Sequence, residues 1–142
     1  GGLSGGARRA SPGEGLARAA KKYLGERDGR IADDDMRASI LAYNMQRAAF
    51  ALTAQRANEE NRSGTPAEAT SIFKLVGARL QQNGADLKRQ VMGVRGLGIE
   101  GFEPDELEAT SEWLSLKATT IYGGSDEIQA NIIAKRVLGL PD

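Results

Sequence analysis

The feature that most constrains the fold is a pair of long helical patterns, residues 33–61 and residues 65–92. Apolar residues in both recur at spacings of three and four, which places them along one side of a helix. In the first pattern they are Ala38, Leu41, Met45, Ala48 and Leu52, and in the second Phe73, Val76, Leu80, Leu87 and Val91. Only Ser63-Gly64 interrupts the two patterns, so we expect two long antiparallel helices.

The residues at the ends of these patterns support helix boundaries. Acidic residues at the start of the first helix suit the positive end of the helix dipole. Thr65 is suited to cap the second helix, with Pro66 at its first position and Glu68 completing a capping box. Gly93 is suited to end it.

Three shorter helices are expected over residues 14–24, 106–117 and 125–137. No segment alternates convincingly between apolar and polar residues, so no strand is predicted. We therefore predict an all-α fold, a four-helix up-and-down bundle. Residues 1–12 are rich in glycine and small residues and are expected to be a flexible leading segment. Residues 13–142 are expected to form one helical domain that is a fragment of a longer protein.

The composition restricts the partners. Lysine and arginine number 19, as do aspartate and glutamate, so the net charge is zero. Nucleic-acid binding requires clustered cations, and we expect no such partner. No apolar run is long enough to span a membrane, and no signal peptide is visible, which favours a cytoplasmic location.

The chain contains neither histidine nor cysteine. A Ser-His-Asp triad and a cysteine nucleophile are therefore impossible. The common zinc sites and the Glu-x-x-His di-iron site of helical bundles are excluded too, so no metal is expected. Any general base must be Asp, Glu, Lys or Tyr.

Two glycine-rich segments are candidate ligand sites. Residues 96–101 spell G-x-G-x-x-G, but a long helix precedes them and Pro104 follows, whereas a dinucleotide fold needs a strand and then a helix. We interpret them as an interhelical loop. Residues 122–124 precede Ser125, a natural helix cap. They form either a simple turn or a loop that lets helix N–H groups contact a polar ligand.

The C-terminal stretch Thr119-Thr120-Ile121-Tyr122-Gly123-Gly124-Ser125-Asp126-Glu127-Ile128-Gln129, continuing to Leu138-Gly139-Leu140-Pro141, resembles the closing signature of the acyl-CoA dehydrogenases. It is most similar to the actinobacterial branch that handles fatty or steroid side-chain thioesters. The resemblance implies the C-terminal helical bundle of a flavoenzyme that desaturates acyl-CoA thioesters. In that family FAD lies at a subunit interface within a dimer or tetramer.

The resemblance also implies roles for individual residues. Gln90 and Gly93 match the turn that contacts FAD across the dimer, while Ser125 and Glu127 match the FAD contacts of the last helix. The loop that lines the thioester pocket corresponds to Tyr122, Gly123 and Gly124. The basic residue that often binds the FAD pyrophosphate from the partner subunit has no clear match here, and Arg27 and Arg30 are the candidates for it.

Gly123 departs from the commonest form of the signature, in which the residue after this tyrosine is the glutamate that removes the substrate α-proton. Glycine has no side chain and cannot take a proton, so no catalytic residue is assigned. Three explanations stay open. The base is a glutamate just upstream of Gly1, or the chain is the inactive subunit type of a mixed tetramer, or Asp126 or Glu127 acts as the base.

The partners implied are an acyl-CoA substrate, same-family subunits in homo- or hetero-oligomers, and electron-transfer flavoprotein or another electron acceptor. The fragment alone is expected to be inactive. The rival hypothesis is a non-catalytic helical scaffold subunit of a mixed flavoprotein assembly, which the missing base favours.

Overall fold

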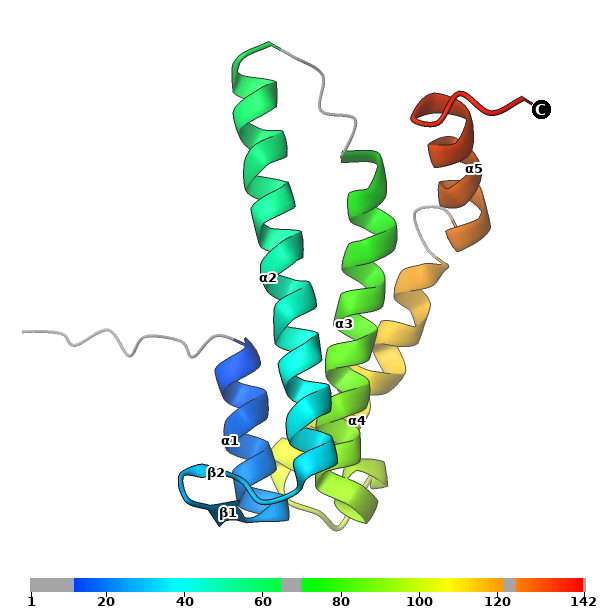
Figure 1. Ribbon diagram of the computed structural model, residues 1–142. Coiled ribbons are helices and arrows are strands. Elements are labelled where there is room, and N and C mark those ends of the chain that lie inside the picture. Colours follow the sequence, from blue (N-terminus) through cyan, green and yellow to red (C-terminus); the bar gives the residue numbers. More distant parts are fainter. Residues whose placement is uncertain (1–11, 65–69, 122–124, 142) are drawn as a thin grey trace, which may run out of the picture.

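The computed structural model describes residues 12–64, 70–121 and 125–141, and within them the fold is helical, as predicted (Figure 1). The elements in chain order are α1 (Pro12–Leu24), β1 (Glu26–Arg27), β2 (Arg30–Ile31), α2 (Asp34–Arg62), α3 (Thr70–Met92), the 3₁₀ helix η1 (Gly93–Leu97), α4 (Pro104–Leu116), the 3₁₀ helix η2 (Lys117–Thr120) and α5 (Asp126–Arg136).

The helix α3 is the centre of the molecule, because it packs against α1, α2, α4 and α5. Helices α2 and α3 run antiparallel, with α1 and α4 beside them and α5 beyond the end of α4 (Figure 1). The four-helix plan therefore holds for α1–α4. Within the described residues, no helix is both long enough and apolar enough to cross a bilayer.

Helix ends follow the local chemistry of the sequence. The Asp33 carboxylate caps α2 by accepting a hydrogen bond of 2.8 Å from the Met36 N–H. Gly93 ends α3 with a φ of 59°, a left-handed conformation that glycine adopts without strain. The predicted capping box at Thr65 lies outside the described residues. The helix α4 begins at Pro104, slightly before the predicted start, because Glu103 and Glu106 form a capping box there.

A small β-hairpin between α1 and α2 was not predicted. Strands β1 and β2 pair antiparallel, with Arg27 opposite Arg30. Asp28 and Gly29 between them have φ values of 51° and 74°, as a tight two-residue hairpin turn requires. The Asp-Gly pair signalled this turn, but two-residue strands are too short to show alternation.

The hydrophobic core lies where α1, α2, α3 and β2 meet. Its buried members are Leu16, Ala20, Ile31, Ile40, Tyr43, Leu80 and Val91. The predicted apolar side of α3 is confirmed, since Leu80 and Val91 are buried and Val76 and Leu87 pack against them.

The prediction that the apolar side of α2 with Leu41, Met45 and Leu52 faces the core is wrong. Leu41, Met45 and Leu52 expose 60%, 66% and 67% of their surface, respectively. The buried residues of α2 are Ile40, Tyr43 and Ala57. The helix has apolar residues on more than one side, and packing against α1 and α3 selects the side with Ile40 and Tyr43. We call the residues Leu41, Met45 and Leu52 the outer face of α2.

Candidate cofactor and substrate site

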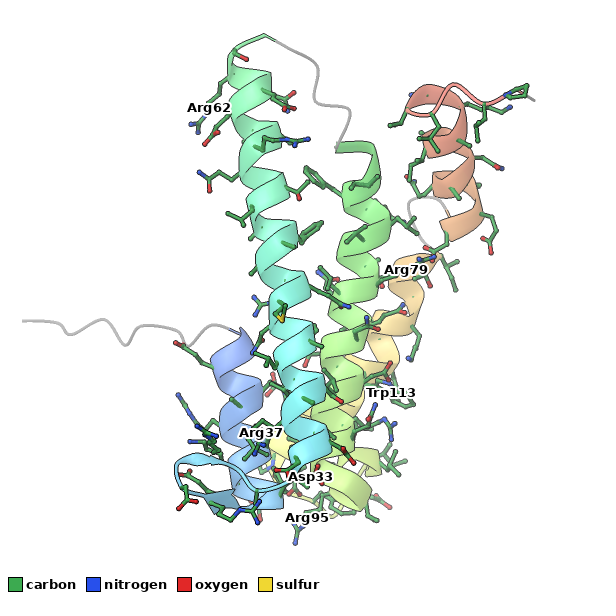
Figure 2. The ribbon with its side chains drawn as sticks, in the orientation of Figure 1. Asp33, Arg37, Arg62, Arg79, Arg95 and Trp113 are labelled. Carbon is green, nitrogen blue, oxygen red and sulfur yellow. The ribbon has the colours of Figure 1, made fainter. Side chains whose placement is uncertain are left out.

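The start of α5 presents a polar surface. The Ser125 side chain caps the helix by accepting a 3.4 Å hydrogen bond from the Ile128 N–H. Glu127 is exposed, and hydrogen bonds from its own backbone N–H and from the Ser125 hydroxyl lower the pKa of its carboxyl. Asp126 pairs with Arg79 of α3 at 3.3 Å, and Figure 2 shows Arg79 beside the start of α5. This ion pair links the start of α5 to α3.

The loop residues Tyr122, Gly123 and Gly124 lie outside the described residues. Their assignment to the thioester pocket therefore stays a prediction. Ser125, which follows them directly, is half-buried.

Gln90 and Gly93 lie at the C-terminal end of α3 and in the first position of η1. Both are exposed, and a Cβ placed on Gly93 would meet no neighbouring atom within 4 Å. Val94, in η1, exposes 77% of its surface. The backbone at this end is thus open to a ligand or a second chain.

One chain does not bring the predicted cofactor residues together. Asp126 at the start of α5 contacts α3 at Arg79, and Gln90 lies 11 residues further along α3. At 1.5 Å per residue, this separation is about 16 Å along the helix axis. The surface around Ser125 and the surface around Gln90 are therefore two separate regions of this chain.

A cluster of arginines lies on and beside the hairpin. Arg27, Arg30 and Arg37 line a hollow of about 420 Å³ together with Asp28 and Asp34. Asp34 accepts contacts from Arg37 at 3.0 Å and Arg27 at 3.7 Å, whereas Arg30 has no ion pair among the described residues. The cluster carries one more positive than negative charge, which suits an anionic group. Sequence reasoning proposed Arg27 and Arg30 but missed Arg37, which only the fold brings to the hairpin.

Comparison with known proteins decides the family. The profile described as the C-terminal domain of acyl-CoA dehydrogenase matches residues 4–138. The chain belongs to the acyl-CoA dehydrogenase family.

Three curated acyl-CoA dehydrogenases match parts of this domain. Acyl-CoA dehydrogenase IpdE1 of Mycolicibacterium smegmatis is 45% identical over 71 residues, which cover 50% of this chain and 18% of that protein. IpdE1 of Mycobacterium tuberculosis gives the same values. Acyl-CoA dehydrogenase FadE34 of Mycobacterium tuberculosis is 30% identical over 121 residues, which cover 84% of this chain and 16% of that protein. The matches thus span less than a fifth of the relatives' length. No solved structure matches the chain.

Among the described residues of this acyl-CoA dehydrogenase domain, the most deeply buried acid is Glu106, which is 1% exposed. Its carboxylate accepts hydrogen bonds from the Tyr23 hydroxyl at 2.8 Å, the Arg95 guanidinium at 3.2 Å and the Glu103 N–H at 3.1 Å. Burial alone would raise the pKa of Glu106, but these hydrogen bonds and the Arg95 charge outweigh burial and lower it. Sequence reasoning missed this network, because only the fold brings Tyr23 to Glu106.

Glu106, Asp126 and Glu127 are not arranged as unencumbered bases. Glu106 is fully occupied by donors, Asp126 is paired with Arg79, and the lowered pKa of Glu127 makes it a weaker proton acceptor. The structure also shows no group of three or more potential metal-ligating residues within its described ranges.

Proposed function

We propose that this chain is the C-terminal domain of an FAD-dependent enzyme that desaturates an acyl-CoA thioester between its α and β carbons. The observation that carries this proposal is a pair of polar surfaces, one at the start of α5 beside Arg79 of α3 and one at the C-terminal end of α3. One holds the family-matched Ser125 and Glu127, and the other holds Gln90 and Gly93.

The chemistry of the two surfaces suits different parts of FAD. The arginines at the hairpin lie at the same end of the molecule as η1 (Figure 1) and would hold the pyrophosphate. The acids at the α5 start disfavour phosphate, so Ser125 and Glu127 would contact the hydroxyl-bearing or ring portion. When bound, FAD accepts the hydride that leaves the substrate β-carbon.

The separation of about 16 Å along α3 supports sites shared between subunits. Each cofactor would lie against the α5 start of one chain and the α3 end of another. The outer face of α2 supplies an apolar surface on which such subunits could associate. We propose same-family subunits, identical or different, as the partners, and electron-transfer flavoprotein or a similar acceptor for the electrons.

The catalytic base would lie outside this chain, because Gly123 cannot accept a proton. Either a glutamate upstream in the longer polypeptide or a partner subunit would supply it. The substrate class we propose is a fatty-acyl or steroid side-chain thioester of lipid degradation, as the resemblance of the C-terminal signature implies.

The proposal is tested on the longer polypeptide, purified alone and with any same-family neighbour. We would record its flavin spectrum and add acyl-CoA and steroid side-chain thioesters without oxygen. If the base lies upstream, the added thioesters are expected to bleach the flavin of the polypeptide when it is purified alone. A protein that contains no flavin in either preparation would contradict the proposal.

Sharing of the site is tested by mixing variants. Gln90→Ala and Ser125→Ala should each lower flavin content, because each weakens one half of every site. Co-expression of the two variants should restore some intact sites, since a mixed pair combines an unchanged α3 end with an unchanged α5 start. Flavin content no higher than in either single variant would indicate a site within one chain.

The second candidate function is a non-catalytic scaffold subunit of a mixed flavoprotein assembly. The specific observation in its favour is Gly123 at the usual base position. In that case the thioesters should bleach the flavin only when the same-family neighbour protein is present. Restoring a carboxylate by Gly123→Glu would then be expected to give the chain some activity of its own.

A further inference from the structure

A large cavity lies between α1, α2, α3 and α4, apart from Gln90, Ser125 and the hairpin. Its volume is about 940 Å³, at the upper end of the range for small-molecule pockets. Small residues make this space, among them Gly77 and Gly84 on α3 and Ala19 on α1. Leu16, Phe50 and Leu80 supply apolar walls.

The cations around this cavity are not all neutralised. Lys22 pairs with Asp105 at 3.3 Å, and Lys88 pairs with Glu112 at 3.5 Å. Two further lining cations, Arg18 of α1 and Arg47 of α2, have no ion pair with any described residue. The lining therefore has an excess of two positive charges, and Arg47 is half-buried. A half-buried arginine without an acid favours an anion beside it.

Tyr43 supplies a second polar group on the wall of this cavity. Its side chain is only 9% exposed and lines the cavity, yet its hydroxyl has no hydrogen bond with any residue that the structure describes. The hydroxyl lies against Gly84, where a Cβ would clash with it. The Arg47 guanidinium lies over the Tyr43 ring, 5.8 Å from its centroid. Burial raises the pKa of Tyr43, so the hydroxyl stays protonated and able to donate.

We propose that this cavity binds an apolar carboxylic acid, with its carboxylate held by Arg47 and the Tyr43 hydroxyl and its hydrocarbon part along Leu16, Phe50 and Leu80. A carboxylate offers two acceptors, one for the guanidinium and one for the phenol. A neutral molecule would leave Arg47 without a counter-ion. A phosphate dianion suits the cavity less, because Asp105 and Glu112 also line it.

The test uses calorimetric titration of the full chain with dodecanoate, dodecanol and dodecyl phosphate, each below its micelle concentration. We expect saturable binding of dodecanoate to one site per chain. Dodecanol should bind at least about tenfold more weakly, because it lacks the charge that pairs with Arg47. No flavin is added, so the result is independent of the proposed dehydrogenase function.

Three variants locate the site. Gly77→Leu should abolish binding by filling the cavity, and a Cβ there makes only an ordinary 3.5 Å contact with Phe50. Replacing a helical glycine also favours the helix, so lost binding would not reflect unfolding. Arg47→Met should weaken dodecanoate binding roughly ten- to a hundredfold, and Tyr43→Phe about two- to tenfold.

The matched control is Arg56→Met, which removes an exposed arginine of the same helix that pairs with Glu60 outside the cavity. It should leave binding unchanged. Absence of saturable dodecanoate binding would overturn the proposal, as would unchanged binding in Gly77→Leu or equal effects of Arg47→Met and Arg56→Met. Binding of dodecyl phosphate as tight as that of dodecanoate would assign the site to phosphates instead.

Discussion

The two ends of the helical bundle are held together in different ways. At the end with the hairpin and η1, Glu106 of α4 receives hydrogen bonds from Tyr23 of α1 and Arg95 of η1, and Figure 2 shows Arg95 at this end. The other end has few buried residues within the described part of the chain. After Phe50, α2 buries Ala57 alone, and α5 buries none.

A further contrast separates the Glu106 network, which is closed by contacts within one chain, from the outer face of α2, which the chain leaves uncovered. The buried Glu106 carboxylate is satisfied by donors of the same chain. The outer face of α2 instead leaves large apolar side chains in water, a pattern typical of a surface that contacts another protein. The following experiments compare these two kinds of surface.

The largest effect is expected from two adjacent residues of α2. Ile40 is 3% exposed and Leu41 is 60% exposed. Ile40→Ala should lower the free energy of unfolding by about 2–5 kcal/mol, because it leaves a cavity in the core. Leu41→Ala should change it by less than about 0.5 kcal/mol in the isolated chain. Chemical denaturation measures both values, and equal losses would show that the outer face is buried in one chain.

Acid should weaken the Glu106 end selectively. The pKa of Glu106 is lowered from 4.5, so its contribution to stability is fully present above pH 4.5 and is lost as the pH falls through the folded-state pKa. Glu106→Gln should be less stable than the native chain at neutral pH, and this difference should shrink in acid. The control Glu108→Gln alters an exposed carboxyl of the same helix. Thermal unfolding between pH 7 and pH 3 would test this, and a difference independent of pH would contradict it.

Charges on the outer face of α2 should reduce assembly without reducing stability. The double variant Leu41→Lys and Leu52→Lys should weaken subunit association at least about tenfold, because each lysine would have to be desolvated in the contact. Sedimentation of the protein measures the association. The control Arg62→Lys, at the end of α2 (Figure 2), keeps the charge and should leave association unchanged. Unchanged assembly of the double variant would place the contact elsewhere.

The smallest effect is expected at the start of α5. Ser125→Ala removes the helix cap and should destabilise α5 by about 0.5–1 kcal/mol. Because α5 has no buried residue within the described part, hydrogen exchange should show faster exchange there and little change in α3. Ser125→Asn keeps a capping oxygen and should restore protection. Equal protection in all three proteins would show that packing alone holds α5.

Local sequence signals gave the helices and several of their ends. The spacing of Leu80, Leu87 and Val91 predicted the packed side of α3, and Gly93 marked its end. The same reasoning failed for α2, because Leu41 and Ile40 are equally apolar and periodicity does not show which one meets a neighbouring helix. The hairpin was missed because each of its strands has only two residues.

The sequence alone determined the helical class, the chemistries excluded by the lack of histidine and cysteine, and the family, because these depend on residue types and local spacing. Tertiary structure alone decided that Ser125 and Gln90 lie far apart, that Tyr23 and Arg95 meet at Glu106, and that a cavity opens beside Tyr43. These features depend on contacts between residues distant in the chain. Such contacts are set by how whole helices pack, which no local pattern specifies.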